Sequence, residues 1–268
     1  MIPQETIDKL EETWRSISDF CQTLSEEQWK SLTQLPQWTV QDNLSHLVAF
    51  EADFQGIPRS QHTAADKSHV KNELGSTNED DVDVRRSLLG AEVLAEWNEV
   101  TALRLQVLRT ANADYFAQET MTPAGPGTMA DFLHLRVLDC WTHEQDMRRA
   151  LGVPGHQSGP SAEHTIDRLI RTLPIVIGKR AGTPEGQSVV IRITEHVTRL
   201  VAITVVNGRG QISNVEPPSS MCDISMNSDV FLQLATGRAT YEDLATQISI
   251  SGDAEHANRV LTQFTMMI

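Results

Sequence analysis

The first half of the chain carries apolar residues at helical spacing. Within residues 4–24 they recur at steps of three or four, as one buried stripe of a helix requires. These positions are Ile7, Leu10, Trp14, Ile17 and Cys21. Equivalent patterns predict three more long helices, over residues 39–54, 88–111 and 128–151. Four long helices predict an antiparallel bundle.

Local signals mark where these helices begin and end. Thr39 and Asp42 resemble a capping box, with Asp in the place of the usual Glu. Gly152, with Pro154 just beyond it, is a typical stop signal for the fourth helix. Residues 55–80 are polar and show no periodicity, so we expect a long loop there, and such loops often bind ligands.

The second half changes its period. A helix over about 161–178 precedes two β-branched runs, 188–194 and 199–206, whose short polar connection predicts a hairpin. The later alternating segments 223–227 and 247–251 indicate further strands, and the intervening residues 229–236 and the C-terminal stretch through Phe264 indicate helices. This pattern is typical of a small α+β domain with an antiparallel sheet.

Charge divides the chain at the same place. Up to Gly152 there are 25 acidic and 13 basic residues, and after it 11 and 9. All five tryptophans also precede that point. The sequence therefore predicts an α+β protein of two domains, a helical bundle over 1–154 and a smaller domain over 155–268.

Composition narrows the class of protein. The net charge of −14 disfavours nucleic acid and anionic membrane surfaces as partners. No apolar run is long enough to cross a bilayer, and the first residues lack the pattern of a signal peptide. Three cysteines without metal-knuckle spacing argue against a disulfide framework. We therefore expect a globular protein of the cytoplasm.

The fourth helix contains the strongest chemical pattern. Asp139 and His143 are four residues apart and share one face, which Arg136 and Asp146 extend. On the second helix His46 lies among apolar residues and is expected to point into the bundle. Two imidazoles and one carboxylate inside a bundle suit zinc with an open fourth position.

A simpler interpretation remains open for each of these residues. His46 can be a core histidine with a hydrogen-bond partner, and Asp139 with His143 can be a pair on the helix surface. Asp146 can orient a ligand imidazole or stabilise a polar interior. Arg85 and Arg86 can be solvated or can clamp a carboxylate.

Several longer segments resemble the mycothiol-dependent maleylpyruvate isomerase family. They are WTVQDNLSHLVAFE (38–51), HVKNELGSTNE (69–79), GAEVLAEWNEVTALR (90–104), RVLDCWTHEQDMRRALG (136–152), and the later FLQLATGR and ISGDAE. The resemblance covers most of the chain in order. It implies a DinB-like metal-binding bundle followed by a domain similar to sterol carrier protein.

The resemblance also implies site residues. His46, Asp139 and His143 match the positions of the zinc ligands, although this chain has Asp where the family has Glu. Arg85 and Arg86 are the candidates for a catalytic arginine that holds an anionic substrate. In the loop segment that begins at His69, that histidine and Asn72 are expected to contact the thiol cofactor.

The implied activity is metal-assisted thiol chemistry, in which zinc activates mycothiol for isomerisation of maleylpyruvate to fumarylpyruvate. The implied partners are therefore a small thiol and a small anionic or electrophilic substrate. A mycothiol S-transferase acting on electrophiles needs the same zinc site. A non-catalytic module that binds a metal and an apolar ligand, or a regulator that binds a partner through its acidic surface, are the alternatives from other classes.

Overall fold

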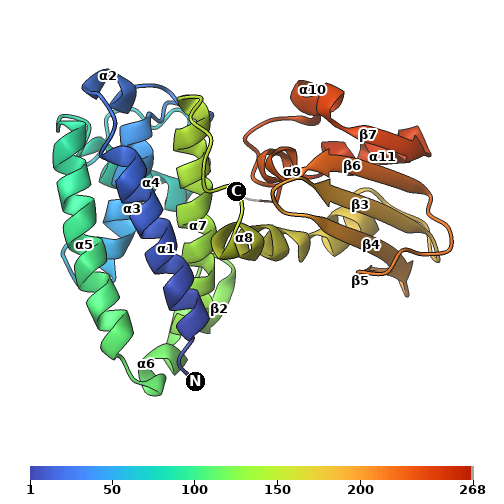
Figure 1. Cartoon of the computed structure of the whole chain (residues 1–268), viewed down its shortest axis with the longest axis horizontal. Helices are drawn as coiled ribbons and strands as arrows, with labels where there is room; N and C mark the ends of the chain where they lie inside the picture. The colour runs from blue at the N-terminus through green and yellow to red at the C-terminus, as the bar shows by residue number, and fades with distance from the viewer. Residues whose placement is uncertain (267–268) are drawn as a thin grey trace. The chain divides into compact units, whose positions relative to one another are not determined.

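The structure is a computed structural model that describes residues 1–266. The chain forms two compact units, Met1–His156 and Gln157–Ile268. The first unit is helical and the second combines a sheet with helices (Figure 1). Within the described residues, no helix is long and apolar enough to cross a membrane.

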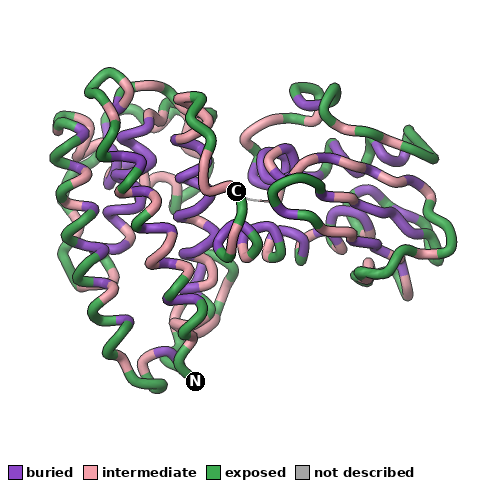
Figure 2. The backbone as a smooth tube through the Cα atoms, in the orientation of Figure 1, coloured by how far each residue is buried: buried purple, intermediate pink, exposed green. Residues whose placement is uncertain are grey.

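Four long helices make up most of the first unit. They are α1 (Gln4–Cys21), α3 (Val40–Asp53), α5 (Gly90–Thr110) and α7 (Met129–Ala150). Their apolar faces meet in one core, in which Trp14, Leu44, Trp97 and Val137 are all buried. The buried residues follow the inner sides of the helices (Figure 2). The four predicted helices are therefore confirmed.

The directions of these helices differ from a simple antiparallel bundle. Helices α3 and α5 both begin next to the short helix α2 (Glu26–Trp29): the amide of Gly90 donates to Glu26 (3.0 Å) and Lys30 donates to Gln41 (2.5 Å). Helices α3 and α5 therefore run parallel to each other, and opposite to α1 and α7 (Figure 1). The long connection between α3 and α5 permits this arrangement because it carries the chain back along the bundle.

That connection is not the continuous loop that we expected. Part of it folds as α4 (Glu73–Asp83), which Asn72 caps through a hydrogen bond from the amide of Gly75 (2.8 Å). The helix has only three buried residues, Glu79, Asp81 and Val82. Because two of these three are acidic, the sequence has no apolar stripe that would indicate this helix.

Two short elements separate α5 from α7. Helix α6 (Ala113–Ala117) leads into a hairpin of β1 (Glu119–Thr122) and β2 (Gly125–Thr128). Thr128 then starts α7 through a capping box with Asp131. The hairpin was not predicted, because strands of four residues that include Gly and Pro carry no alternating pattern.

The first unit ends beyond its last helix. His156 has a left-handed backbone conformation, with φ of 52°. Its carbonyl oxygen accepts a hydrogen bond from the indole of Trp141 (2.8 Å), and its Nδ1 lies 2.7 Å from the buried carboxylate of Glu144. These contacts hold the segment after α7 against the bundle.

The second unit is built on a five-stranded sheet in the order β5-β4-β3-β6-β7. The strands are β3 (Ser188–Thr194), β4 (Arg199–Val206), β5 (Arg209–Ser213), β6 (Cys222–Asn227) and β7 (Ser249–Gly252). The predicted hairpin is confirmed as β3 and β4. The sheet is mixed rather than antiparallel, because the chain crosses over after β5 and places β6 parallel to β3.

The second unit also contains several helices, before, between and after the strands in the sequence. They are α8 (Pro160–Ile170), a π-helical segment (Ile175–Arg180), α9 (Ser228–Ala235), α10 (Tyr241–Leu244), a 3-10 turn (Ala245–Gln247) and α11 (Ala254–Thr262). The helix expected over 161–178 is thus shorter, and its last part has π geometry. The central strands β3 and β4 are Val/Ile-rich; β3 is mostly buried and β4 is buried in its middle part, which accounts for their strong sequence signal.

Candidate metal centre

Three potential ligands meet inside the bundle. His46 comes from α3, and Asp139 and His143 come from α7. One ligand atom from each residue can be chosen so that all three lie within 4.8 Å of one another. The two imidazoles are buried, and the carboxylate is partly exposed. The structure therefore brings together the three residues that the sequence singled out.

The distances in this group fit a metal better than hydrogen bonds. Nε2 of His46 lies 3.5 Å from Oδ2 of Asp139, and Nε2 of His143 lies 3.6 Å from Oδ1. Both separations are too long for good hydrogen bonds. With zinc–ligand bonds of about 2.1 Å, neighbouring ligand atoms of a tetrahedral centre are about 3.4 Å apart. The donor set and its spacing therefore suit zinc.

The start of α3 fixes the direction of its polar face. Thr39 and Asp42 form the predicted capping box, which satisfies amides of the first turn. The side-chain amide of Asn43 donates to the carbonyl of Thr39 (2.8 Å), so its oxygen points the other way. His46 lies one turn later on the same face.

Asn43 determines which nitrogen of His143 is available. Its Oδ1 lies 2.8 Å from Nδ1 of His143 and can only accept a hydrogen bond, so Nδ1 of the neutral imidazole carries the proton. Nε2, which faces Asp139, then keeps its lone pair. Asp146 lies 3.4 Å from the same Nδ1 and supports this orientation.

Asp139 is held from behind by a buried arginine. Nη1 of Arg136 lies 2.5 Å from Oδ2 of Asp139, while Nε and Nη2 of the same guanidinium lie 2.9 Å from Oε1 of Glu51. Oε2 of Glu51 in turn faces Arg104 at 3.7 Å. Arg136, Glu51 and Arg104 are all almost inaccessible to solvent. Asp139 is thus the end of a buried chain of alternating charges.

These surroundings set the protonation states. Burial lowers the pKa of His46 to about 4, although the neighbouring Asp139 acts in the opposite direction. Burial also disfavours the charged forms of Asp139 and His143, but their partners outweigh it. Arg136 and the imidazoles hold the pKa of Asp139 well below its usual range, and Asp139 and Asp146 raise the pKa of His143. His46 is therefore a neutral imidazole and Asp139 an anion at neutral pH.

Aromatic rings flank the two imidazoles. The Trp38 ring lies 5.3 Å from that of His46 and 6.1 Å from that of His143. Phe50 packs edge-on against His46 at 5.0 Å. These rings limit the access of water to the group.

Glu79 on α4 joins three residues beside this group. Its buried carboxylate accepts a hydrogen bond from the indole of Trp38 (2.9 Å), lies 3.0 Å from Nε2 of His69, and pairs with Arg86 (2.7 Å). Arg86 also contacts Asp42 at 3.2 Å. Two of the predicted residues, His69 and Arg86, are thus connected through Glu79 to the ring that covers the imidazoles.

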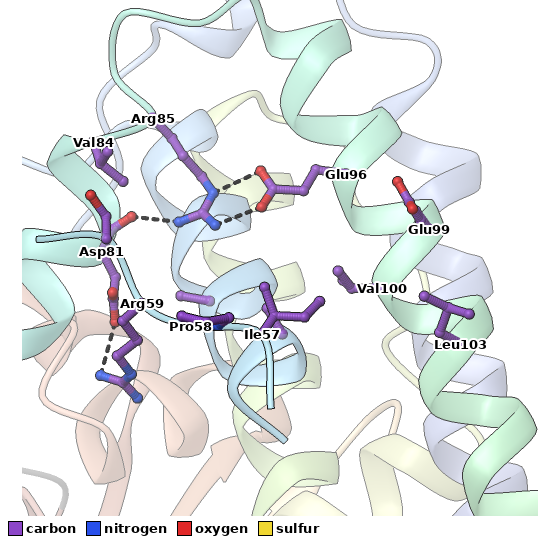
Figure 3. Close-up of a pocket in the computed structure, with 13 residues that line it drawn as sticks. Ile57, Pro58, Arg59, Asp81, Val84, Arg85, Glu96, Glu99, Val100 and Leu103 are labelled. Atoms are coloured by element: carbon purple, nitrogen blue, oxygen red, sulfur yellow. Dashed lines mark hydrogen bonds and ion pairs between the residues drawn. The ribbon is translucent and has the colours of Figure 1, made fainter. Parts of the chain in front are cut away.

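Arg85 lies elsewhere, in a cavity of about 260 Å3 between α3, α4 and α5 (Figure 3). Its guanidinium makes a bidentate contact with Glu96 (2.6 and 2.8 Å) and donates to the carbonyl of Asp81 (2.7 Å). The cavity shares no lining residue with the His46, Asp139 and His143 group. The structure therefore separates Arg85 from Arg86.

Asn72 and the buried Cys140, which follows Asp139 in the sequence, have local structural roles. The side-chain oxygen of Asn72 is engaged as the cap of α4. Burial raises the pKa of the Cys140 thiol to about 12, so it is protonated and unreactive at neutral pH, as expected for a structural cysteine.

Sequence reasoning missed Glu51, Asn43 and Glu79. Glu51 had a recognisable signal, because it continues the buried stripe of Leu44, Leu47 and Val48 at helical spacing. An acidic residue in such a stripe requires a buried partner. Glu79 had no comparable signal, because its helix was itself not predicted.

Comparisons with known proteins bear on the whole chain. Residues 10–148 match the family model described as the mycothiol maleylpyruvate isomerase N-terminal domain. Crystal structures of the mycothiol-dependent maleylpyruvate isomerase and of a mutant of it have the same fold, with TM-scores of 0.53 and 0.57. Each is 14% identical to this protein, and each alignment covers 92% of this chain and 92% of that chain. No curated protein sequence matches this chain.

The family model extends over more than half of the chain, includes helices α3 and α5 in full and covers α7 up to residue 148. It also includes His46, Asp139 and His143. This chain therefore belongs to the mycothiol maleylpyruvate isomerase family.

Proposed function

We propose that this protein is a zinc-dependent, mycothiol-using isomerase that converts maleylpyruvate to fumarylpyruvate. His46, Asp139 and His143 would hold the metal, which would supply a binding place for the thiol. The observation that carries this proposal is the separation of 3.5 and 3.6 Å between the imidazole nitrogens and the two oxygens of Asp139. Such spacing leaves room for a metal among these atoms.

When bound, zinc lowers the pKa of a coordinated thiol, and the thiolate of mycothiol supplies a nucleophile for reversible addition to the conjugated double bond. The protein's own residues prepare the site for this chemistry. Burial keeps His46 neutral, and Asn43 directs the lone pair of His143 towards Asp139. Trp38 and Phe50 exclude water from the imidazoles.

Arg86 is the arginine that we assign to the anionic substrate. It is connected through Glu79 to Trp38, whereas Arg85 is engaged by Glu96 in a separate cavity. Nη2 of Arg86 is buried and has no hydrogen-bond partner among the described residues, so it is available to a carboxylate. His69, on the same Glu79 carboxylate, is our candidate contact for the thiol cofactor, and the engagement of Asn72 as a helix cap makes it a weaker candidate.

The first test is the zinc content of protein purified without chelator. We expect about one zinc per wild-type chain and none in a His46→Ala/His143→Ala double variant, because one carboxylate alone does not retain the metal. His196→Ala, which removes an exposed imidazole from the second unit, is the control and should keep its zinc. Zinc-free wild-type protein that does not take up the metal on reconstitution would contradict the proposal.

The second measurement identifies the reaction. Zinc-loaded protein is incubated with mycothiol and either maleylpyruvate or a generic electrophile. Catalytic formation of fumarylpyruvate without net consumption of mycothiol supports the isomerase. Stoichiometric consumption of mycothiol with the electrophile alone would replace the isomerase with an S-transferase at the same metal site.

A further inference from the structure

The two oxygens of Asp139 have different surroundings. Oδ2 receives the guanidinium of Arg136 at 2.5 Å, which is a short charge-assisted contact. Oδ1 faces His143 at 3.6 Å, and no Lys or Arg among residues 1–266 forms an ion pair with it. Oδ2, which also lies 3.5 Å from Nε2 of His46, is therefore engaged by a protein cation, whereas Oδ1 on the His143 side is not.

Arg136 itself is fixed more firmly than a surface arginine. Two of its nitrogens contact one oxygen of Glu51, and its guanidinium stacks over Phe50 at 4.8 Å. Glu51 is held in turn by Arg104, which donates to the hydroxyl of Tyr115 (2.6 Å). Because an arginine stays charged in proteins, Arg136 is a permanent cation beside Asp139.

We propose that Arg136 is a positioning residue that reserves Oδ2 of Asp139, so that Asp139 binds the metal through a single oxygen and one coordination position stays open. This inference rests on the metal centre proposed above. Arg136 has no place on the metal itself. It acts through Asp139, and Glu51 is the residue that holds it there.

The number of oxygens that Asp139 offers to the metal decides whether a coordination position stays open. A carboxylate with both oxygens free can chelate a divalent ion and fill the position that a substrate needs. The short arm of aspartate brings its carboxylate close to α7, where Arg136, three residues earlier on the same helix, reaches it. A guanidinium on one oxygen removes the chelating mode and leaves a site with three protein ligands.

Cobalt(II) makes this proposal measurable, because four-coordinate cobalt absorbs visible light several times more strongly than five- or six-coordinate cobalt. Metal-free wild type, Arg136→Lys, Arg136→Met and Glu51→Gln are titrated with cobalt(II), and affinity and absorptivity are recorded. Thermal melting shows whether each variant is folded. Arg148→Gln is the matched control: it removes a cation from the same helix that pairs with Glu144 and not with Asp139.

We expect an intense four-coordinate spectrum for wild type, Arg136→Lys and Arg148→Gln. Arg136→Met should bind cobalt about 10- to 100-fold more weakly and with lower absorptivity, because Asp139 is no longer oriented and offers both oxygens. Glu51→Gln should shift the spectrum in the same direction by less. If Arg136→Met does not fold, the comparison of Glu51→Gln with Arg148→Gln tests the role of Arg136.

Two failures are distinguishable. Wild-type protein that binds no cobalt overturns the metal centre, and the role of Arg136 falls with it. Wild-type protein that binds cobalt, with a spectrum and affinity that stay the same in folded Arg136→Met or Glu51→Gln, overturns only the role of Arg136. A spectral change of equal size in Arg148→Gln also overturns it, since the effect would then follow from the lost charge alone.

Discussion

The two units bury different kinds of side chain in their interiors. Among the described residues, the bundle buries ten acidic, basic or histidine side chains. They are Asp42, His46, Glu51, Glu79, Asp81, Arg104, Arg136, His143, Glu144 and Asp146. The second unit buries one such side chain up to residue 266, His256. Its central strands β3 and β4 contribute mainly valine and isoleucine to the core.

This difference helps to distinguish residues that stabilise the fold from residues that serve a functional site. Burying an ion is costly unless a partner compensates it, and a well-packed apolar group in its place is often equally stable. The bundle nevertheless keeps charged groups in its interior, and several of them converge on His46, Asp139 and His143. A stable helical bundle does not need such residues, so their concentration points to a functional site. The second unit shows what a core without that requirement looks like.

The largest expected effect is the loss of a buried charge from the bundle. Glu144 has no exposed surface and contacts Ser16, Arg148 and His156 at 2.6 to 2.8 Å. Glu144→Ala leaves these groups without their acceptor and should lower the free energy of unfolding by about 3–5 kcal/mol. Urea unfolding followed by tryptophan fluorescence measures this, because all five tryptophans belong to the bundle.

The control for this prediction is an exposed carboxylate on the same unit. Glu99 is exposed on α5, and Glu99→Ala should change the free energy by less than about 0.5 kcal/mol. Equal effects of the two variants would show that the buried charges of the bundle are not held by their partners.

A somewhat smaller effect is expected for truncation of the sheet core. Ile191 on β3 is fully buried, and Ile191→Ala should destabilise the second unit by about 3 kcal/mol through lost apolar contacts and the resulting cavity. Urea unfolding followed by circular dichroism of the strands measures it. The zinc content should stay as in wild type. Loss of zinc from folded Ile191→Ala would show that the core of the second unit influences the metal centre of the bundle.

The smallest expected effect concerns His256, the one histidine that is buried among the described residues of the second unit. Burial and the neighbouring Arg259 lower the pKa of His256, which Thr183 contacts at 2.8 Å. The unfolded chain therefore binds a proton more readily than the folded unit. The contribution of His256 to stability is full above the unfolded pKa of about 6.5 and is lost as the pH falls below it.

The measurement is the urea midpoint of the second unit at about pH 7.5 and pH 5.5. Wild type should lose more stability on acidification than His256→Gln, because glutamine does not titrate. An identical loss in both proteins would show that His256 does not contribute to the pH dependence.

Much of this architecture was predictable, because an element that buries one face carries apolar residues at a regular spacing in the sequence. The stripe from Ile7 to Cys21 predicted α1, and the β-branched runs predicted β3 and β4. The structure also brings together His46, Asp139 and His143, since four-residue spacing on α7 already placed two of them on one face.

Other features were hidden for physical reasons. Helix α4 is stabilised by its Asn72 cap and by buried acidic residues, so hydrophobic periodicity does not reveal it. The Arg136, Glu51 and Arg104 chain joins residues from three helices, and spacing within one helix cannot show such a long-range contact. The parallel pairing of β3 with β6 depends on the crossover after β5 and not on either strand's own pattern.

His156 determines where the bundle can end when it is transferred to another protein by recombination. A recombination joint placed directly after α7 would discard the residue that accepts from the Trp141 indole and pairs with Glu144. The severed bundle would keep all of its helices, but the buried Trp141 indole and Oε2 of Glu144 would lose the contacts that His156 makes with them. The transferable module therefore extends to His156, six residues beyond its last helix at Ala150.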